Sequence, residues 1–202
     1  MTHHQPSPPK KKVYDADDNY GCSRCRQLTR DCTMHYIKAS TMEKMIPTAI
    51  REVSAYVDHW PEAFKQNIGL LLFGDVGTGK SFAAGCVANS LLDQNIPVLM
   101  TNFPSILDRL GDYDLLIIDD LGVERSTGYA MEQMFSIVDS RYRSGKPLIV
   151  TTNLKLDELK HPPDLAHARI YDRILERCAP ILFAGKNFRE DNAASTKAAA
   201  AP

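Results

Sequence analysis

The stretch IGLLLFGDVGTGKS, residues 68–81, decides the fold because it runs from an apolar strand through a glycine-rich turn into a helix. Residues 74–81 satisfy the pattern G-x-x-x-x-G-K-[ST] of a phosphate-binding loop. Glycines let successive backbone N–H groups point inward at phosphate oxygens, and the following helix adds the positive end of its dipole. The alternative is a glycine-rich turn that matches by chance, but the strand before it and the helix after it are the context that the motif requires. The stretch therefore predicts a nucleotide-binding site.

Two side chains of this loop have predicted roles in binding the nucleotide. Lys80 is expected to reach the β- and γ-phosphates, and the Ser81 hydroxyl is suited to Mg²⁺. The expected cofactors are therefore ATP and Mg²⁺. The residues predicted to bind them are Gly74, Asp75, Val76, Gly77, Thr78, Gly79, Lys80, Ser81, Phe82 and Asp119.

A second part of the site is predicted at LLIIDD, residues 115–120, where a continuous apolar strand ends in two carboxylates. A strand that is apolar on both faces belongs in a covered parallel sheet, whose carboxyl end is where such sheets bind ligands. Asp119 is expected to hold Mg²⁺, and Asp120 to orient and polarise the attacking water, with Glu124 as the next candidate for that role. The alternative is a core strand that runs into an acidic turn. The phosphate-binding loop favours the functional interpretation.

Apolar runs alternate with amphipathic segments, and this alternation predicts a doubly wound, mostly parallel α/β sheet. Besides the strand before the loop, strands are expected at residues 97–101, 113–118 and 147–152. An amphipathic helix is expected over residues 40–59, closed by Trp60 and Pro61.

The chain of 202 residues suits one main domain with a small appendage. Residues 1–39 are expected to be a disordered arm with a possible zinc-binding segment, residues 40–190 the ATPase domain, and residues 191–202 a disordered tail. The formal net charge of −1 does not indicate nucleic-acid binding by bulk charge. With no apolar run of membrane-spanning length and no signal-peptide core, a cytoplasmic location without membrane contact is expected.

A cluster of soft ligands lies in the N-terminal arm at Cys22, Cys25, Cys32 and His35. Three thiolates and an imidazole can close a tetrahedral Zn²⁺ site of the structural type, in which the protein fills all four positions. The alternative is a cysteine-rich turn with free thiols, because the spacing between the two pairs is shorter than in common zinc fingers. Zn²⁺ is thus a possible third cofactor.

Two further motifs are candidates for the catalytic set. Asn153 follows the strand at 147–152, where it can contact the γ-phosphate or the attacking water, or cap the next helix, or do both. Arg169, Arg173 and Arg177 recur every four residues along one side of a predicted helix. Such a stripe is usually a solvated face, but in a P-loop ATPase it can supply an arginine finger to a neighbouring subunit.

The motifs GDVGTGKS, LLIIDDLG, TTNL and RIYDRILE, followed by NFR, together resemble those of the AAA+ ATPases related to DnaC, DnaI and IstB. These are loaders of the replicative helicase and transposition helper ATPases, and the match is closest to short DnaC-like proteins of Gram-positive phages and mobile elements. The resemblance covers about residues 45–190. It implies a three-layer AAA+ fold that hydrolyses ATP to ADP and phosphate, with catalytic roles for Asp120, Asn153, Arg173 and Arg169.

The resemblance also implies partners: a replicative DNA helicase, single-stranded DNA and further copies of the chain when it is active. Only residues 103–112 fill the space in which the family usually carries a longer insertion with a DNA-contacting helix, and the N-terminal region is short. Both departures weaken the expectation of DNA contact and helicase loading, but neither affects ATP binding. Three functions therefore stay open: a helicase loader, a helper of a transposase, and a shortened relative that binds nucleotide without loading anything.

Overall fold

The structure is a computed structural model, and it describes residues 47–101, 111–122, 128–185 and 187–188. Several predictions fall outside the described residues: the cysteine and histidine cluster of the arm, Glu124, and the tail at 191–202.

In the described part of the chain, five strands form one sheet in the order β2-β3-β4-β1-β5, and every neighbouring pair is parallel. This confirms the parallel α/β sheet that the sequence predicts. The strands are β1 (Gly69–Phe73), β2 (Val98–Thr101), β3 (Leu115–Leu121), β4 (Leu148–Thr152) and β5 (Cys178–Leu182).

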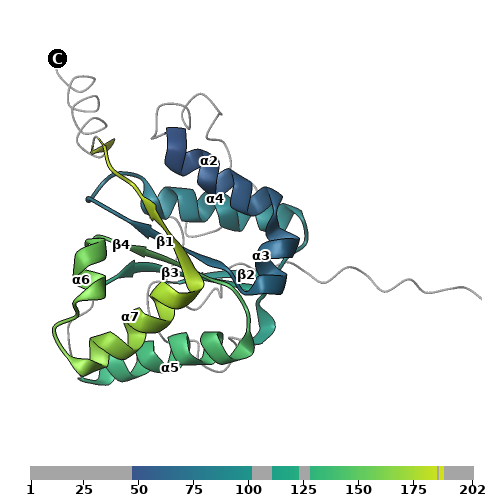
Figure 1. The fold of residues 1–202 in the computed structure, drawn as a ribbon. Helices are drawn as coiled ribbons and strands as arrows, with labels where there is room; N and C mark the ends of the chain where they lie inside the picture. Colours follow the sequence, from purple (N-terminus) through teal and green to yellow (C-terminus); the bar gives the residue numbers. More distant parts are fainter. Residues whose placement is uncertain (1–46, 102–110, 123–127, 186, 189–202) are drawn as a thin grey trace, which may run out of the picture.

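Helices cover both faces of the sheet and complete three layers (Figure 1). One face packs against α2 (Pro47–Asp58), α3 (Trp60–Gln66) and α4 (Lys80–Asp93). The other face packs against α5 (Gly128–Ser144), α6 (Leu156–Lys160) and α7 (Leu165–Arg177). None of the described helices has the length and apolar composition that a membrane crossing requires.

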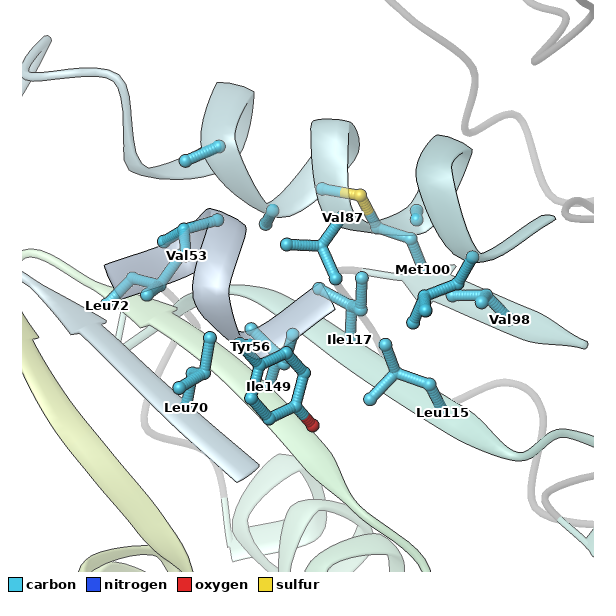
Figure 2. Close-up of a cluster of buried hydrophobic side chains, with 14 of the residues drawn as sticks. Val53, Tyr56, Leu70, Leu72, Val87, Val98, Met100, Leu115, Ile117 and Ile149 are labelled. Carbon is cyan, nitrogen blue, oxygen red and sulfur yellow. The ribbon is translucent and has the colours of Figure 1, made fainter. Parts of the chain in front are cut away.

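The two hydrophobic cores follow from the two-residue period of the strands, which sends successive side chains to opposite faces. Leu70 and Leu72 of β1 and Ile117 of β3 pack beneath α2 and α4, as Figure 2 shows. Leu71 of β1 and Leu116 of β3 pack against α5 and α7. Each of these side chains is at most 4% exposed, and burying a Leu or Ile side chain stabilises a fold by about 1.5–3 kcal/mol. The sheet is thus fixed from both sides.

The prediction that Trp60 and Pro61 close the first helix is wrong in its detail. The helix α2 ends at Asp58, and Trp60 begins the short helix α3. Pro61 lies in the first turn of α3, where its missing N–H costs no helical hydrogen bond. The Trp60 ring packs on Tyr56 and Phe64, with ring centroids 5.9 and 5.6 Å away, so the break is anchored in the core.

Candidate nucleotide-binding site

The predicted phosphate-binding loop connects the end of β1 to the start of α4, at the carboxyl-terminal edge of the sheet. Gly74, Gly77 and Gly79 adopt φ angles of 134°, 79° and 95°, which residues with a Cβ atom rarely adopt. The helix α4 then begins at Lys80, so the amino-terminal end of this helix faces the turn. The loop therefore has the backbone shape that an anion requires.

Lys80 turns its ammonium back into this loop. Its side chain is 4% exposed, and Nζ donates hydrogen bonds to the carbonyl oxygens of Gly74 at 2.8 Å and Asp75 at 2.7 Å. Thr78 Oγ1 also donates to the Asp75 carbonyl, at 2.8 Å. A buried positive charge thus lies within the turn that is predicted to hold phosphate.

The chain that follows β5 lies against the same loop. The Phe188 N–H donates to the Gly77 carbonyl at 3.0 Å, and a Cβ atom on Gly77 would clash with Asn187 Oδ1. Residue 77 thus needs to be glycine both for its φ angle and for the close approach of Asn187.

The predicted carboxylates lie within β3 rather than after it, because the strand continues to Leu121 instead of ending at Ile118. The register against β4 shifts between Ile118 and Leu121, and Asp120 has a φ of 60°. The sequence did not predict this β-bulge, because a continuous apolar run contains no signal for an inserted residue.

Asp119 lies where α4, β3 and β4 meet. Its Oδ1 accepts a hydrogen bond from Thr151 Oγ1 at 2.6 Å, and its carboxylate also has a hydrogen bond with the Ser81 side chain. Burial raises the pKa of Asp119 above its usual value, and the hydrogen bonds with Thr151 and Ser81 oppose that rise. The charge of Asp120 raises this pKa further, and the charge of Lys80 lowers it. The structure therefore brings Lys80, Ser81 and Asp119 together.

These residues fit a Mg²⁺-bound nucleotide. A hydroxyl and a carboxylate are the oxygen ligands that Mg²⁺ prefers. The loop supplies inward N–H groups and a buried ammonium for phosphates. Among the described residues there is no group of three or more His, Cys, Asp or Glu side chains placed to hold a metal by themselves.

The other predicted catalytic residues lie in different surroundings. Asn153 is exposed, directly after β4, and Arg169 is exposed on α7. Arg173 is instead held within the chain: its Nη2 pairs with Asp139 Oδ1 of α5 at 2.9 Å, and its guanidinium lies over the Phe135 ring, 5.0 Å from the centroid. Arg173 therefore joins α7 to α5, whereas Arg169 faces outward.

Sequence reasoning missed Thr151, which contacts both predicted carboxylate positions. The available signal was its place in the TTN turn, directly before the end of a strand expected to lie beside the strand of Asp119.

Comparison with known proteins gives a consistent result. The model of the family described as IstB-like ATP binding protein matches residues 60–196. The replicative helicase loader DnaC of Escherichia coli strain K12 is 28% identical over 171 residues, which cover 75% of this chain and 66% of DnaC. The replicative helicase loader DnaI of Bacillus subtilis strain 168 is 27% identical over 147 residues, which cover 60% of this chain and 47% of DnaI.

A crystal structure of DnaI superimposes with a TM-score of 0.59 at 27% identity, covering 69% of this chain and 82% of that one. The fold is thus the AAA+ P-loop fold of these loaders. The chain spans about half to two thirds of the length of the curated relatives it matches.

Proposed function

This chain belongs to the family of IstB-like ATP-binding proteins, and on that premise we propose that it is a Mg²⁺-dependent ATPase that acts in the cytoplasm as a loader of a replicative DNA helicase. The observation that carries the proposal is the meeting of Lys80, Ser81 and the Asp119 carboxylate at one edge of the sheet. Family membership supports ATP binding, and the two named relatives support the helicase as the partner.

The loop residues and Lys80 bind the triphosphate in this proposal. Phosphate oxygens replace the Gly74 and Asp75 carbonyls as partners of Lys80 Nζ. This exchange favours binding because a charged oxygen accepts a stronger hydrogen bond than a carbonyl. Ser81 and Asp119 hold Mg²⁺, which supplies compensation for the charge on the β- and γ-phosphates. Asp119 must be ionised for this role, and the hydrogen bonds with Thr151 and Ser81 favour that form.

Hydrolysis further requires an oriented water, and we assign the orienting role to Asp120, with Asn153, which directly follows β4, as a second residue that contacts the water or the γ-phosphate. The matched test compares Asp120→Asn with Asp112→Asn, which changes an exposed carboxylate at the other edge of the sheet. Asp120→Asn is expected to bind ATP normally while turnover falls by two orders of magnitude or more, roughly the size of a general-base contribution. Turnover equal to that of the wild type would move the role elsewhere, to Glu124 first.

For the arginine finger, the exposed Arg169 is the better candidate, because Arg173 is held by Asp139 and its removal also weakens the packing of α7 on α5. We propose that Arg169 completes the site of a neighbouring copy, worth about 10³-fold in rate. Mixing Arg169→Ala with Lys80→Ala subunits tests this, since one supplies an intact nucleotide site and the other an intact finger. Recovery of activity in the mixture supports a finger in trans. Two variants that assemble without recovery overturn it.

The partner is tested by capture on a hexameric replicative helicase, with and without ATP. ATP-dependent capture of the wild type, but not of Lys80→Ala, supports loading. One alternative is a helper ATPase of a transposase, the role that the resemblance to IstB-type proteins implies. ATP binding with capture by a transposase and none by the helicase supports that alternative, and ATP binding with neither supports the shortened relative. Contact with single-stranded DNA, to which the short segment at 103–112 gives little support, is tested in the same assay by adding an oligonucleotide.

A further inference from the structure

We propose that Thr151 is a positioning residue of the nucleotide site: its hydroxyl fixes Asp119 and Asp120 in the arrangement that Mg²⁺ binding and hydrolysis require. This inference rests on the proposed ATPase function. The inference goes beyond that function because Thr151 is neither part of the phosphate-binding loop nor one of the residues expected to touch the nucleotide.

The pairing of β3 with β4 places Thr151 opposite both carboxylates. Ile118 pairs with Val150, and Leu121 pairs with Thr152. Two residues of β3, Asp119 and Asp120, therefore face a single residue of β4, which is Thr151. This is the two-against-one arrangement of a β-bulge, a device that redirects side chains near active sites.

The bulge changes which face of the sheet each side chain reaches. In a regular strand Leu121 would share a face with Leu115 and Ile117, beneath α4, because side chains alternate. Leu121 packs instead with Leu116 and Ile118 on the face of α5 and α7. The alternation is thus broken between Ile118 and Leu121, where it would otherwise direct two consecutive carboxylates to opposite faces. Asp120 has the left-handed φ of 60°, a conformation that needs support in a residue other than glycine.

The Thr151 hydroxyl supplies that support from both sides. It accepts a hydrogen bond from the Asp120 N–H at 2.9 Å, replacing the strand partner that the bulge removes. It also donates a hydrogen bond to Asp119 Oδ1 at 2.6 Å. Thr151 is fully buried, so no water can take its place without rearrangement. One hydroxyl therefore sets the backbone of one carboxylate and the orientation of the other.

Thr152 is a matched control because it is the next residue of the same strand and equally buried. Its hydroxyl donates to the Leu121 carbonyl at 2.7 Å and accepts from the Leu154 N–H at 3.1 Å, so both of its partners are backbone groups. A Thr-to-Val change at either position keeps the shape of the side chain and removes two hydrogen bonds of a buried residue. A general loss of stability should follow from both changes, but a loss of metal-dependent binding should follow from one.

The experiment measures the affinity for a fluorescent ATP analogue with Mg²⁺ and with EDTA, together with kcat and KM, for the full chain and three variants. Thr151→Val is expected to reduce both the tightening by Mg²⁺ and kcat by 10-fold or more, as for other residues that orient a metal ligand, roughly 10–100-fold. Affinity in EDTA should stay within about twofold, because the loop is unchanged. Thr151→Ser should restore both quantities, and Thr152→Val should keep them even where its stability falls.

The outcomes separate this inference from the proposed function. If Mg²⁺ does not increase the affinity of the wild-type protein for the ATP analogue, the proposed function itself is contradicted. The wild type can instead show Mg²⁺-dependent binding while a folded Thr151→Val variant matches it in binding and kcat. That result overturns only the role of Thr151. Equal losses in Thr151→Val and Thr152→Val likewise overturn it in favour of a purely structural role. If Thr151→Val does not fold, Thr151→Ala and Thr152→Ala replace the valine pair with the same outcomes.

Discussion

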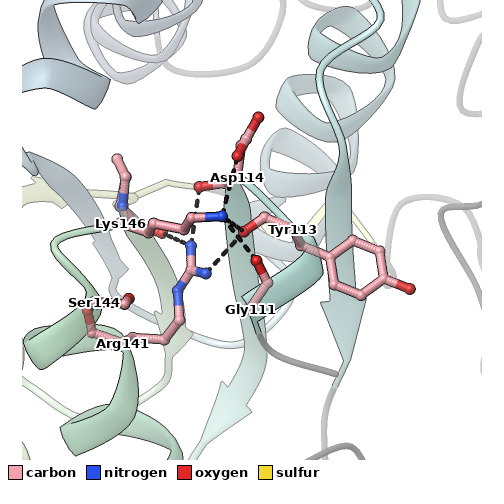
Figure 3. Close-up of polar contacts among 7 residues, drawn as sticks. Gly111, Tyr113, Asp114, Arg141, Ser144 and Lys146 are labelled. Carbon is pink, nitrogen blue, oxygen red and sulfur yellow. Dashed lines mark hydrogen bonds and ion pairs between the residues drawn. The ribbon is translucent and has the colours of Figure 1, made fainter. Parts of the chain in front are cut away.

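Two buried cations lie at opposite edges of the same sheet, and both donate hydrogen bonds to backbone carbonyls. Lys80, 4% exposed, is at the carboxyl-terminal edge and contacts the carbonyls of Gly74 and Asp75. Arg141, 2% exposed, is at the amino-terminal edge and contacts carbonyls that precede β3 and β4 (Figure 3). The two cations thus make similar contacts, but Lys80 is predicted to bind the nucleotide, whereas Arg141 has a structural role.

The difference lies in what each cation holds together. Arg141 donates from Nη1 to Tyr113 O at 2.9 Å and from Nη2 to Asp114 O at 2.9 Å and Pro147 O at 2.7 Å. Its planar fork thus connects two segments that are far apart in the sequence. Burial lowers the pKa of Arg141 to about 10, so the guanidinium stays charged at neutral pH. Lys80 donates its hydrogen bonds to the carbonyls of Gly74 and Asp75, which precede it by six and five residues in the same loop, so a stronger acceptor can replace these partners without moving a strand.

The largest effect is expected when Arg141 is changed to Met. Three backbone carbonyls lose the hydrogen bond from a charged donor, and such a bond contributes about 1.5–3 kcal/mol, so the free energy of unfolding should fall by ~3 kcal/mol or more. Urea unfolding measures this loss. The control is Arg143→Met, an exposed residue of the same helix that pairs with Asp139, for which a loss below ~1 kcal/mol is expected. Equal losses of unfolding free energy in the two variants would show that the Arg141 contacts do not stabilise the amino-terminal edge of the sheet.

The opposite result is expected for Lys80→Ala. Removing the ammonium leaves phosphate charge uncompensated, so the affinity for Mg²⁺-ATP should fall by about 100-fold, or ~3 kcal/mol. The free energy of unfolding without nucleotide should change by less than ~1 kcal/mol, because the Gly74 and Asp75 carbonyls lie in a loop that water reaches when the side chain is removed. Binding of a fluorescent ATP analogue and urea unfolding measure the two quantities. Unchanged affinity would show that residues 74–81 are not a phosphate-binding loop.

These two cations also show what the sequence could and could not predict. Lys80 was predictable because its motif is contiguous, and the parallel sheet followed from local apolar periods. Arg141 was not singled out, although it lies three residues after Val138 and seven after Met134, on the apolar face of α5. A charge at such a position is a signal of a buried polar contact. Its carbonyl partners, 28 and 6 residues away, become neighbours only when β3 and β4 pair.

The same reason limited the prediction of the site. Thr151 meets Asp119 and Asp120 across two strands, 32 and 31 residues away, and no local pattern announces that pairing. The bulge was missed because LLIIDDL is compatible with a regular strand. The residues of the loop could be predicted because they lie close together in the sequence. The side chains that support them could not, because they come from segments that are distant in the sequence.

Two glycines extend the comparison of the edges. Gly77 and Gly145 both have a positive φ, of 79° and 65°, so alanine at either position adds backbone strain of ~1–2 kcal/mol. A Cβ atom on Gly77 would also meet the Asn187 side chain, whereas one on Gly145 meets nothing within 4 Å. Both variants should lose stability in urea, and Gly77→Ala should lose at least as much as Gly145→Ala. Only Gly77→Ala should also weaken binding of the ATP analogue, and a comparable weakening in Gly145→Ala would mean that strain at one edge reaches the other.

The smallest expected effect concerns the two cysteines of the described residues, Cys178 at the start of β5 and Cys86 within α4. Burial raises the pKa of Cys178 to about 12 and that of Cys86 to about 11, so both thiols are almost entirely protonated near neutral pH and Cys178 has the smaller thiolate fraction. Burial against the Leu148 carbonyl, to which the Cys178 thiol donates at 3.2 Å, adds to the protection. Peptide-resolved mass spectrometry after treatment with a small disulfide reagent at pH 8 should therefore find Cys178 several times slower to react than Cys86.

Arg141→Met should accelerate the reaction of Cys178, because it weakens the edge where this thiol lies, and Lys80→Ala should not. A Cys178 that reacts as fast as Cys86 in the wild type would show that the amino-terminal edge opens without unfolding, and the distinction between a structural and an exchangeable cation would then fail.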